Sequence, residues 1–171
     1  MNRVVSNATP LVYLAKADRL DLFLSLFEEI LIPEAVREEV VSKGKRLGYA
    51  DAFVVEKAIK EGRITVRQVQ RTHRVSIPLH PGEVEVISLA LEERLDLRIM
   101  DDAKARAAAE IAGLKPRGTL WLLLEAIKRN RLSFDDFLAA LEAITNQGFY
   151  LREDLYVRVI REARRLTESQ C

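Results

Sequence analysis

The sequence predicts an α/β domain built on a mostly parallel β-sheet. Short apolar runs rich in valine, isoleucine and leucine alternate with longer segments whose apolar residues recur at helical spacing. Alternating strands and helices form parallel sheets, because each helix carries the chain back to the start of the next strand. The chain has 171 residues, 49% of them hydrophobic, which is enough for one core. We therefore expect a single domain over residues 1–171, with C-terminal helices from about residue 133 packed on it.

Local signals place the elements in order. Strands are expected at residues 4–5, 30–32, 64–66 and 97–100, with 114–117 as a weak or edge strand because Pro116 cannot donate to a ladder. Helices are expected at residues 11–15, 19–27, 34–43, 50–60, 83–94, 103–112, 120–127, 133–145 and 152–166. Pro33 starts one of these helices and Gly44 is expected to end it. Thr119 is a candidate helix cap, and Trp121 is expected in the core.

One stretch, residues 67–80, has no periodicity and is expected to be a loop. It carries Arg67, Arg71 and Arg74, which either contact phosphates or form an ordinary solvated surface. Neither of its two histidines has a partner at metal-ligand spacing, so they are assigned no role.

Composition excludes several classes of protein. The net charge is +1 with 31% charged residues, so any basic patch must be local. Cys171 is the single cysteine, which excludes disulfide scaffolds and cysteine zinc sites. No apolar run approaches the ~20 residues of a membrane span, and residues 1–10 lack the layout of a secretory signal. We expect a cytoplasmic protein.

Asp101 and Asp102 follow the apolar run 97–100 directly. Open α/β sheets bind their ligands at the carboxyl ends of the strands, so this pair is a candidate site. The alternative is that one of the two simply caps the next helix.

Two further polar positions belong to the same edge of the sheet. Asn7 lies in the polar turn 6–9 after the first strand. Glu39 falls about 60° from the inward-facing Val36 on a helical wheel, whereas Glu38 is about 160° away. Glu39 can therefore point inward, or it can lie on a solvated helix edge.

Glu83 lies among the apolar positions of helix 83–94, whereas Glu85, Ser88 and Glu92 form a stripe expected to face water. A carboxylate on a buried face needs a partner, and a metal ion is one. Alternatively, Glu83 stays wet and is stabilised by the helix dipole.

These positions can converge, because right-handed crossovers bring the carboxyl ends of all strands to one edge. A cluster of carboxylates without a cation would repel itself. Oxygen ligands without cysteine or paired histidine select a hard ion, Mg²⁺ or Mn²⁺, and such ions serve phosphoryl chemistry.

Four segments then reveal a family resemblance. Residues 4–11 (VVSNATPL), 32–36 (IPEAV, with Glu39), 81–85 (PGEVE) and 99–102 (IMDD) resemble the successive motifs of PIN domains, in a prokaryotic branch akin to VapC-type toxins. The resemblance implies a three-layer α/β/α fold with a central mostly parallel sheet. It also implies Mg²⁺- or Mn²⁺-dependent cleavage of an RNA substrate, a homodimer, and a cognate antitoxin protein as partner.

Carried over by position, the resemblance implicates Asn7, Glu39, Glu83 and Asp101 as catalytic. Thr9, Glu85 and Asp102 are possible neighbours, and Glu39, Glu83, Asp101 and Asp102 are the implied metal ligands. PIN nucleases generally have aspartate where this chain has Asn7, and a neutral amide is the poorer ligand for a hard ion. Two functions are therefore open: a metal-dependent endoribonuclease, or a catalytically weak or inactive PIN-like module that binds RNA or a protein.

Overall fold

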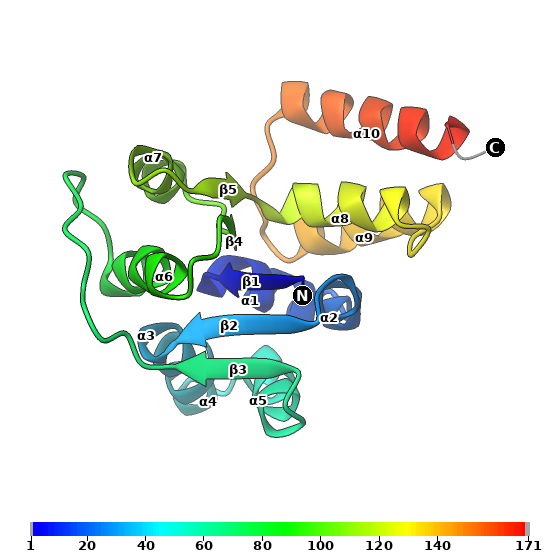
Figure 1. The fold of residues 1–171 in the computed structure, drawn as a ribbon. Coiled ribbons are helices and arrows are strands. Elements are labelled where there is room, and N and C mark those ends of the chain that lie inside the picture. The colour runs from blue at the N-terminus through cyan, green and yellow to red at the C-terminus, as the bar shows by residue number, and fades with distance from the viewer. Residues whose placement is uncertain (1, 170–171) are drawn as a thin grey trace.

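Five parallel strands form the central sheet of the computed structural model, which describes residues 2–169. The strands are β1 (Arg3–Ser6), β2 (Glu29–Pro33), β3 (Ile64–Arg67), β4 (Leu97–Ile99) and β5 (Lys115–Arg117), in the order β3-β2-β1-β4-β5 (Figure 1). All neighbouring pairs are parallel, so the predicted sheet is confirmed and every strand ends at the same edge.

Helices cover both faces of this sheet, which confirms the three-layer α/β/α arrangement (Figure 1). They are α1 (Ala8–Lys16), α2 (Leu20–Leu26), α3 (Glu34–Arg37), η1 (Glu38–Lys43), α4 (Gly44–Arg46), α5 (Ala50–Lys60), α6 (Pro81–Glu92), α7 (Ala103–Ile111), α8 (Thr119–Lys128), α9 (Phe134–Asn146) and α10 (Glu153–Glu168). Strands covered on both faces bury every side chain, which explains the continuous apolar runs of β1 and β2. Val4, Val5 and Ile30–Ile32 are fully buried.

The C-terminal arm, residues 148–165, comprises the segment after α9 and most of α10. Helix α10 packs on α8 and α9 and buries only Val159 and Ala163. The segment before α10 is held to α1, because Phe149 packs edge to face on Tyr13 with ring centroids 5.3 Å apart. The Tyr13 hydroxyl also donates to the carbonyl oxygen of Gly148.

The predicted end of a helix at Gly44 is wrong. The chain stays helical from Glu34 to Arg46 through the wider turns of η1, and it ends near Gly48, which has a φ of 75°. Gly44 serves packing instead: a β-carbon there would lie 2.8 Å from that of Ala52 on α5.

The stretch 68–80 is irregular as predicted, although Arg67 still belongs to β3. It docks on α6 through its backbone: the His73 N–H donates to Ser88 Oγ (2.8 Å), and the Arg71 N–H donates to Glu92 Oε1 (2.6 Å). The prediction that Ser88 faces water is therefore wrong, and its side chain is buried. The polar stripe of α6 is real, and backbone N–H groups of the loop bond to it at Ser88 and at Glu92, which itself remains exposed.

Arg98 is a buried charge in the centre of β4. Its Nη2 donates to the carbonyl oxygens of Leu95 and Asp96, while Nε and Nη1 have no partner among the described residues. Burial lowers the pKa of Arg98 to about 10, so the side chain is still charged at neutral pH.

Candidate active site

A groove of about 890 Å³ opens beside the carboxyl ends of β4 and β5. Asp101 and Asp102 line it together with Thr9 from the first turn of α1. The other lining residues come from α1, α7, β5, α8 and the C-terminal arm, which includes most of α10. The groove lies where parallel sheets place their ligands.

Asp101 is held in the groove by Thr119, the first residue of α8. The Thr119 N–H donates to Oδ1 (2.8 Å) and its hydroxyl donates to Oδ2 (2.7 Å). Gly118 permits this approach, because a β-carbon there would lie 2.7 Å from Oδ1. Thr119 was expected to cap α8 with its side chain. That is wrong, because Gly118 holds the cap position and the hydroxyl binds Asp101.

The surroundings of Asp101 raise the pKa of its carboxyl group. Burial raises the pKa of Asp101, and the two hydrogen bonds from Thr119 and the charge of Arg106 offset this only in part. A cation beside this carboxylate would act in the opposite direction and favour the charged form.

The sequence left open which of the two acids caps the next helix, and in the structure Asp102 caps α7. Its Oδ1 accepts the N–H of Ala105 (2.9 Å) at the start of α7, and the residue is exposed. The two neighbouring acids therefore have different local roles, since Asp101 binds Thr119 and Asp102 caps a helix. Both still line the groove.

Asn7 ties the end of β1 to β4. Its N–H donates to the carbonyl oxygen of Ile99 (2.8 Å), and its side-chain oxygen accepts the N–H of Ala8 (2.8 Å). Asn7 is 5% exposed and does not belong to the groove lining, unlike Thr9. Helix α1 already starts at Ala8, so the predicted polar turn 6–9 is shorter than expected.

Glu39 and Glu83 lie by the first turn of α6. A β-carbon on Gly82 would lie 3.6 Å from Oε2 of Glu39, so this side chain faces the start of α6 even though the residue is exposed. Oε2 of Glu83 accepts the N–H of His80 (3.0 Å), which is a first-turn interaction within its own helix.

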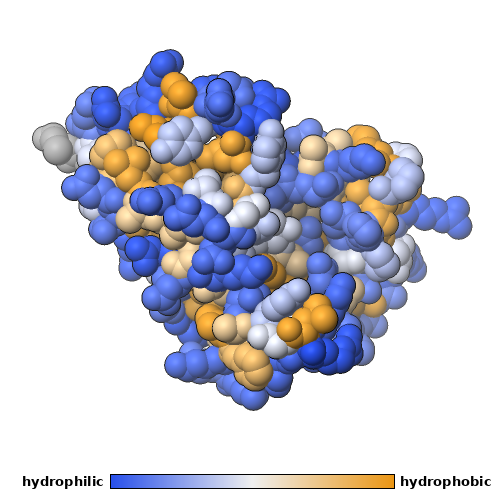
Figure 2. Space-filling model, turned by 180° about the vertical axis from the view of Figure 1, so that it is seen from behind, coloured by the Kyte–Doolittle hydropathy of each residue, from blue (hydrophilic) through white to orange (hydrophobic). Residues whose placement is uncertain are grey.

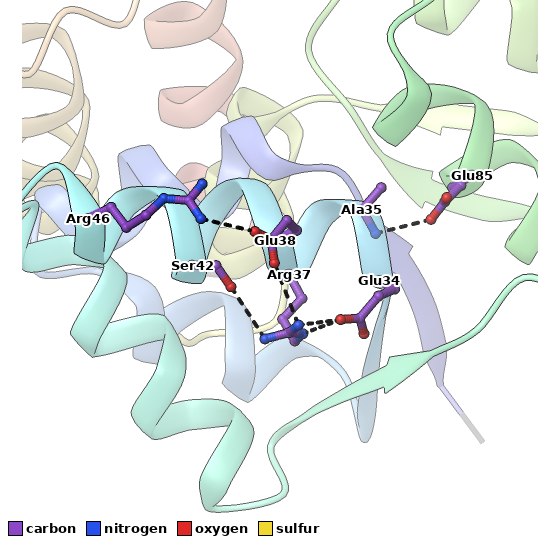
Figure 3. Close-up of polar contacts among 7 residues, drawn as sticks. All are labelled: Glu34, Ala35, Arg37, Glu38, Ser42, Arg46 and Glu85. Atoms are coloured by element: carbon purple, nitrogen blue, oxygen red, sulfur yellow. Dashed lines mark hydrogen bonds and ion pairs between the residues drawn. The ribbon is translucent and has the colours of Figure 1, made fainter.

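Glu85 points across to α3 rather than to water. Its Oε2 accepts the N–H of Ala35 (3.1 Å), the second residue of α3, so the carboxylate sits at a helix N-terminus (Figure 3). Glu38 turns away from the sheet edge, as predicted, and pairs with Arg46 (3.5 Å) and Arg37 (3.7 Å) (Figure 3).

The predicted acids thus lie in two places. Asp101 and Asp102 line the groove, and Glu39 and Glu83 lie around the start of α6. Among residues 2–169, no three histidine, cysteine, aspartate or glutamate side chains are grouped so that they could hold a metal ion.

The groove nevertheless has a donor set that suits a hydrated hard ion. Mg²⁺ usually keeps several waters and takes one or two carboxylates together with substrate phosphates. Asp101, Asp102 and the Thr9 hydroxyl supply oxygen donors on one groove. These residues fit such an ion, but they do not form an all-protein cage.

The groove also contains four arginines that the sequence did not place in it. Arg106, Arg117, Arg158 and Arg161 all line it. Arg117 ends β5, so the reasoning that placed Asp101 at the sheet edge could have placed it as well. Trp121 was expected in the core, but it is only partly buried and forms part of the groove wall.

Comparison with known proteins decides the family. A family model described as "PIN domain" matches residues 3–165. The chain belongs to the PIN-domain family. PIN domains are generally nucleases, which hydrolyse phosphodiester bonds and typically use divalent metal ions.

No curated protein matches the sequence. The chain is similar to a solved structure titled as a domain of a functionally unknown protein from Methanocaldococcus jannaschii DSM 2661. The two are 18% identical over 69% of this chain and 91% of that one, with a TM-score of 0.46. Within residues 2–169, no helix has both the length and the apolar character needed to cross a membrane.

Proposed function

We propose that this PIN domain is a Mg²⁺- or Mn²⁺-dependent endoribonuclease that works in the groove beside β4 and β5. The observation that carries the proposal is Asp101, a desolvated carboxylate at the end of a parallel strand, held by Thr119 in a groove lined by arginines. A perturbed carboxylate in a cleft is a typical mark of a functional site.

Asp101 and Asp102 are the residues that would hold the ion. When bound, a divalent ion supplies charge for the phosphate and makes a water molecule more acidic. Thr119 uses one acceptor site on each oxygen of Asp101, and each oxygen keeps a second lone pair for another ligand. The two hydrogen bonds also fix the carboxylate, which reduces the reorganisation needed when a ligand arrives.

Arg106 and Arg117 are placed to hold the substrate phosphate. Both line the groove with Asp101, and Arg106 is close enough for its charge to lower the pKa of that carboxyl group. Guanidinium groups bind phosphate oxygens in a bidentate manner. They would also offset the charge that develops on the phosphate during hydrolysis.

A second candidate function is favoured by Asn7. Its amide is neutral and its oxygen is already bonded to the N–H of Ala8. Within residues 2–169, the acids also form no group of three that could hold a metal ion. Both observations favour a catalytically weak or inactive PIN-like module that binds RNA or a protein.

Cleavage of a labelled RNA in Mn²⁺ separates the two candidates. The nuclease proposal expects cleavage by the parent protein and a loss of roughly 100-fold or more in Asp101→Asn. Asp135→Asn is the matched control, since Asp135 is an exposed acid of α9, and it should cleave like the parent. Tight RNA binding with no cleavage by any of the three proteins would instead favour the binding module.

We also propose that the protein is the toxin component of a toxin–antitoxin pair, with a cognate antitoxin and a homodimeric assembly. The family resemblance motivates this, and exposed apolar side chains offer surfaces for partners. Leu47, Tyr49 and Phe53 are each at least half exposed near α4 and α5, and α10 exposes Tyr156 and Val157. Figure 2 shows apolar colour gathered near the C-terminal helix and in a second patch at the lower edge.

Light scattering tests the dimer, and copurification with the product of an adjacent small gene tests the antitoxin. A monomer at all concentrations would remove the homodimer, and a neighbouring protein that fails to bind would remove the antitoxin.

A further inference from the structure

Five arginines lie at the start of α10 or within it, and their surroundings differ. Arg152 is paired with Asp154 (2.6 Å) and Arg165 with Glu162 (2.5 Å), so the charges of these two are neutralised locally. Arg158 and Arg161 have no ion pair or hydrogen bond among residues 2–169, and both line the groove that contains Asp101. The groove therefore receives two arginines without an ion pair, while Arg152, Arg164 and Arg165 lie outside its lining. Arg164 has no ion pair either, but it packs over the ring of Phe134 (5.7 Å).

The packing of α10 explains this orientation. Val159 and Ala163 are buried against the domain, which fixes the rotation of the helix. Leu155, Arg158 and Glu162 stand one helical turn apart on the side next to this buried stripe, and all three line the groove. Glu162 is the one acid of α10 in the lining, and Arg165 neutralises it from outside. An anionic ligand would therefore meet a wall of positive net charge.

Aromatic rings lie in the same groove lining as Arg158 and Arg161. Tyr150, just before α10, lines the groove with 83% of its surface exposed, so its ring contributes little to packing. Trp121 of α8 lies partly buried in the same lining. Exposed rings beside unpaired arginines are the combination that binds single-stranded nucleic acid, because bases stack on the rings while the cations bind phosphates. A duplex keeps its bases stacked inside and cannot use such rings.

We propose that the arm formed by residues 148–165 is a binding wall for single-stranded RNA. Arg158 and Arg161 bind backbone phosphates, and Tyr150 stacks on a base of the strand that passes over Asp101. This assignment rests on the proposed nuclease function for the identity of the ligand, but its test does not depend on cleavage. The arm lies outside the sheet and supplies no group to the proposed metal ligands.

The test measures binding of a fluorescently labelled single-stranded RNA by anisotropy, in EDTA, over a series of salt concentrations. Each phosphate contact contributes about −0.7 to the slope of log K against log salt for single strands. Arg158→Gln/Arg161→Gln should therefore make the slope less steep by about 1.4 and weaken binding at low salt. Tyr150→Ala should weaken single-strand binding roughly fivefold or more and leave binding of the matching duplex unchanged.

The matched control is Arg152→Gln/Arg164→Gln, which removes the same charge from the same part of the chain at arginines that lie outside the groove lining and leaves the Arg165–Glu162 pair intact. It should keep the parent slope. Equal changes in the two double variants would show that only net charge matters and would overturn the proposal, as would absence of RNA binding by the parent protein. If the arm variants lose binding but the parent does not cleave RNA in Mn²⁺, the nuclease function fails and the binding wall stands.

Discussion

Asp101 and Thr119 are joined by two hydrogen bonds, one from the Thr119 N–H to Oδ1 and one from its hydroxyl to Oδ2. The two residues are 18 positions apart, and they meet because β4 and β5 are neighbouring parallel strands that end at the same edge. The first residue of α8 therefore fixes the carboxylate that follows β4. Thr119 is completely buried, so its hydroxyl is reserved for this contact.

Thr119→Val keeps the shape of the side chain and removes the hydroxyl. One of the two bonds to Asp101 is lost, and the metal affinity or cleavage rate should fall by roughly 10- to 100-fold. Unfolding in urea should show a loss of about 1 kcal/mol. Thr145→Val is the control, because it removes a hydroxyl that bonds only to backbone oxygens of α9. Equal cleavage by the two variants would show that Thr119 has a purely structural role.

Gly118→Ala tests the close approach itself. The added β-carbon would lie 2.7 Å from Oδ1 of Asp101, so the carboxylate must move, and metal binding should weaken roughly tenfold. At Gly82 the nearest atom would be Oε2 of Glu39 at 3.6 Å, an ordinary contact. Gly82→Ala should therefore bind metal like the parent and be equally or slightly more stable. Calorimetric titration with Mn²⁺ compares them, and equal affinities would contradict the crowding argument.

The raised pKa of Asp101 predicts a pH dependence of stability. The folded state holds this proton more tightly than the unfolded chain does. The resulting stability is complete below the ordinary aspartate pKa of 3.8, and it is lost as the pH rises through the higher folded value. Asp101→Asn cannot titrate, so it should lose less stability than the parent as the pH rises above 3.8 in urea unfolding without metal. Asp135→Asn should follow the parent, and an Asp101→Asn curve parallel to it would contradict the shift.

Asn7→Asp tests the departure from the family pattern. A carboxylate at the end of β1 adds charge near the acids that follow β4, so Mn²⁺ binding should become tighter and cleavage faster. The metal-free protein should become less stable, because Asn7 is buried and a charge there lacks a counterion. Asn130→Asp on the exposed surface is the control for charge alone. If the variant neither binds metal better nor loses stability, Asn7 does not act with the other acids.

The order of the elements could be predicted because its signals are local. Short apolar runs mark β1 to β4, and Pro33 marks a helix start that the structure confirms. Gly44 was misinterpreted as the end of a helix. A glycine is required at this position because Ala52 lies close to it, and the two residues meet only because α4 packs on α5. A contact of this kind leaves no signal in the residues around the glycine.

The candidate site was predictable to the extent that it depends on strand ends. Asp101 was found because a residue that follows a parallel strand lies at the ligand edge. Ser88 was assigned to water because helical periodicity identifies a polar face but not the loop that covers it. Arg158 and Arg161 could not be placed from the sequence, since their position in the groove depends on how α10 docks.

The central claim is that Asp101 and Asp102 hold a divalent ion in the groove, and thermal unfolding with and without Mn²⁺ tests it most directly. At free Mn²⁺ near 100 times its Kd, binding should stabilise the parent by about 2.7 kcal/mol and raise its melting temperature by roughly 5–10 °C. Asp101→Asn should show no rise, and Asp135→Asn should show the full one. Equal melting temperatures with and without Mn²⁺ in the parent, or an undiminished rise in Asp101→Asn, would contradict the claim.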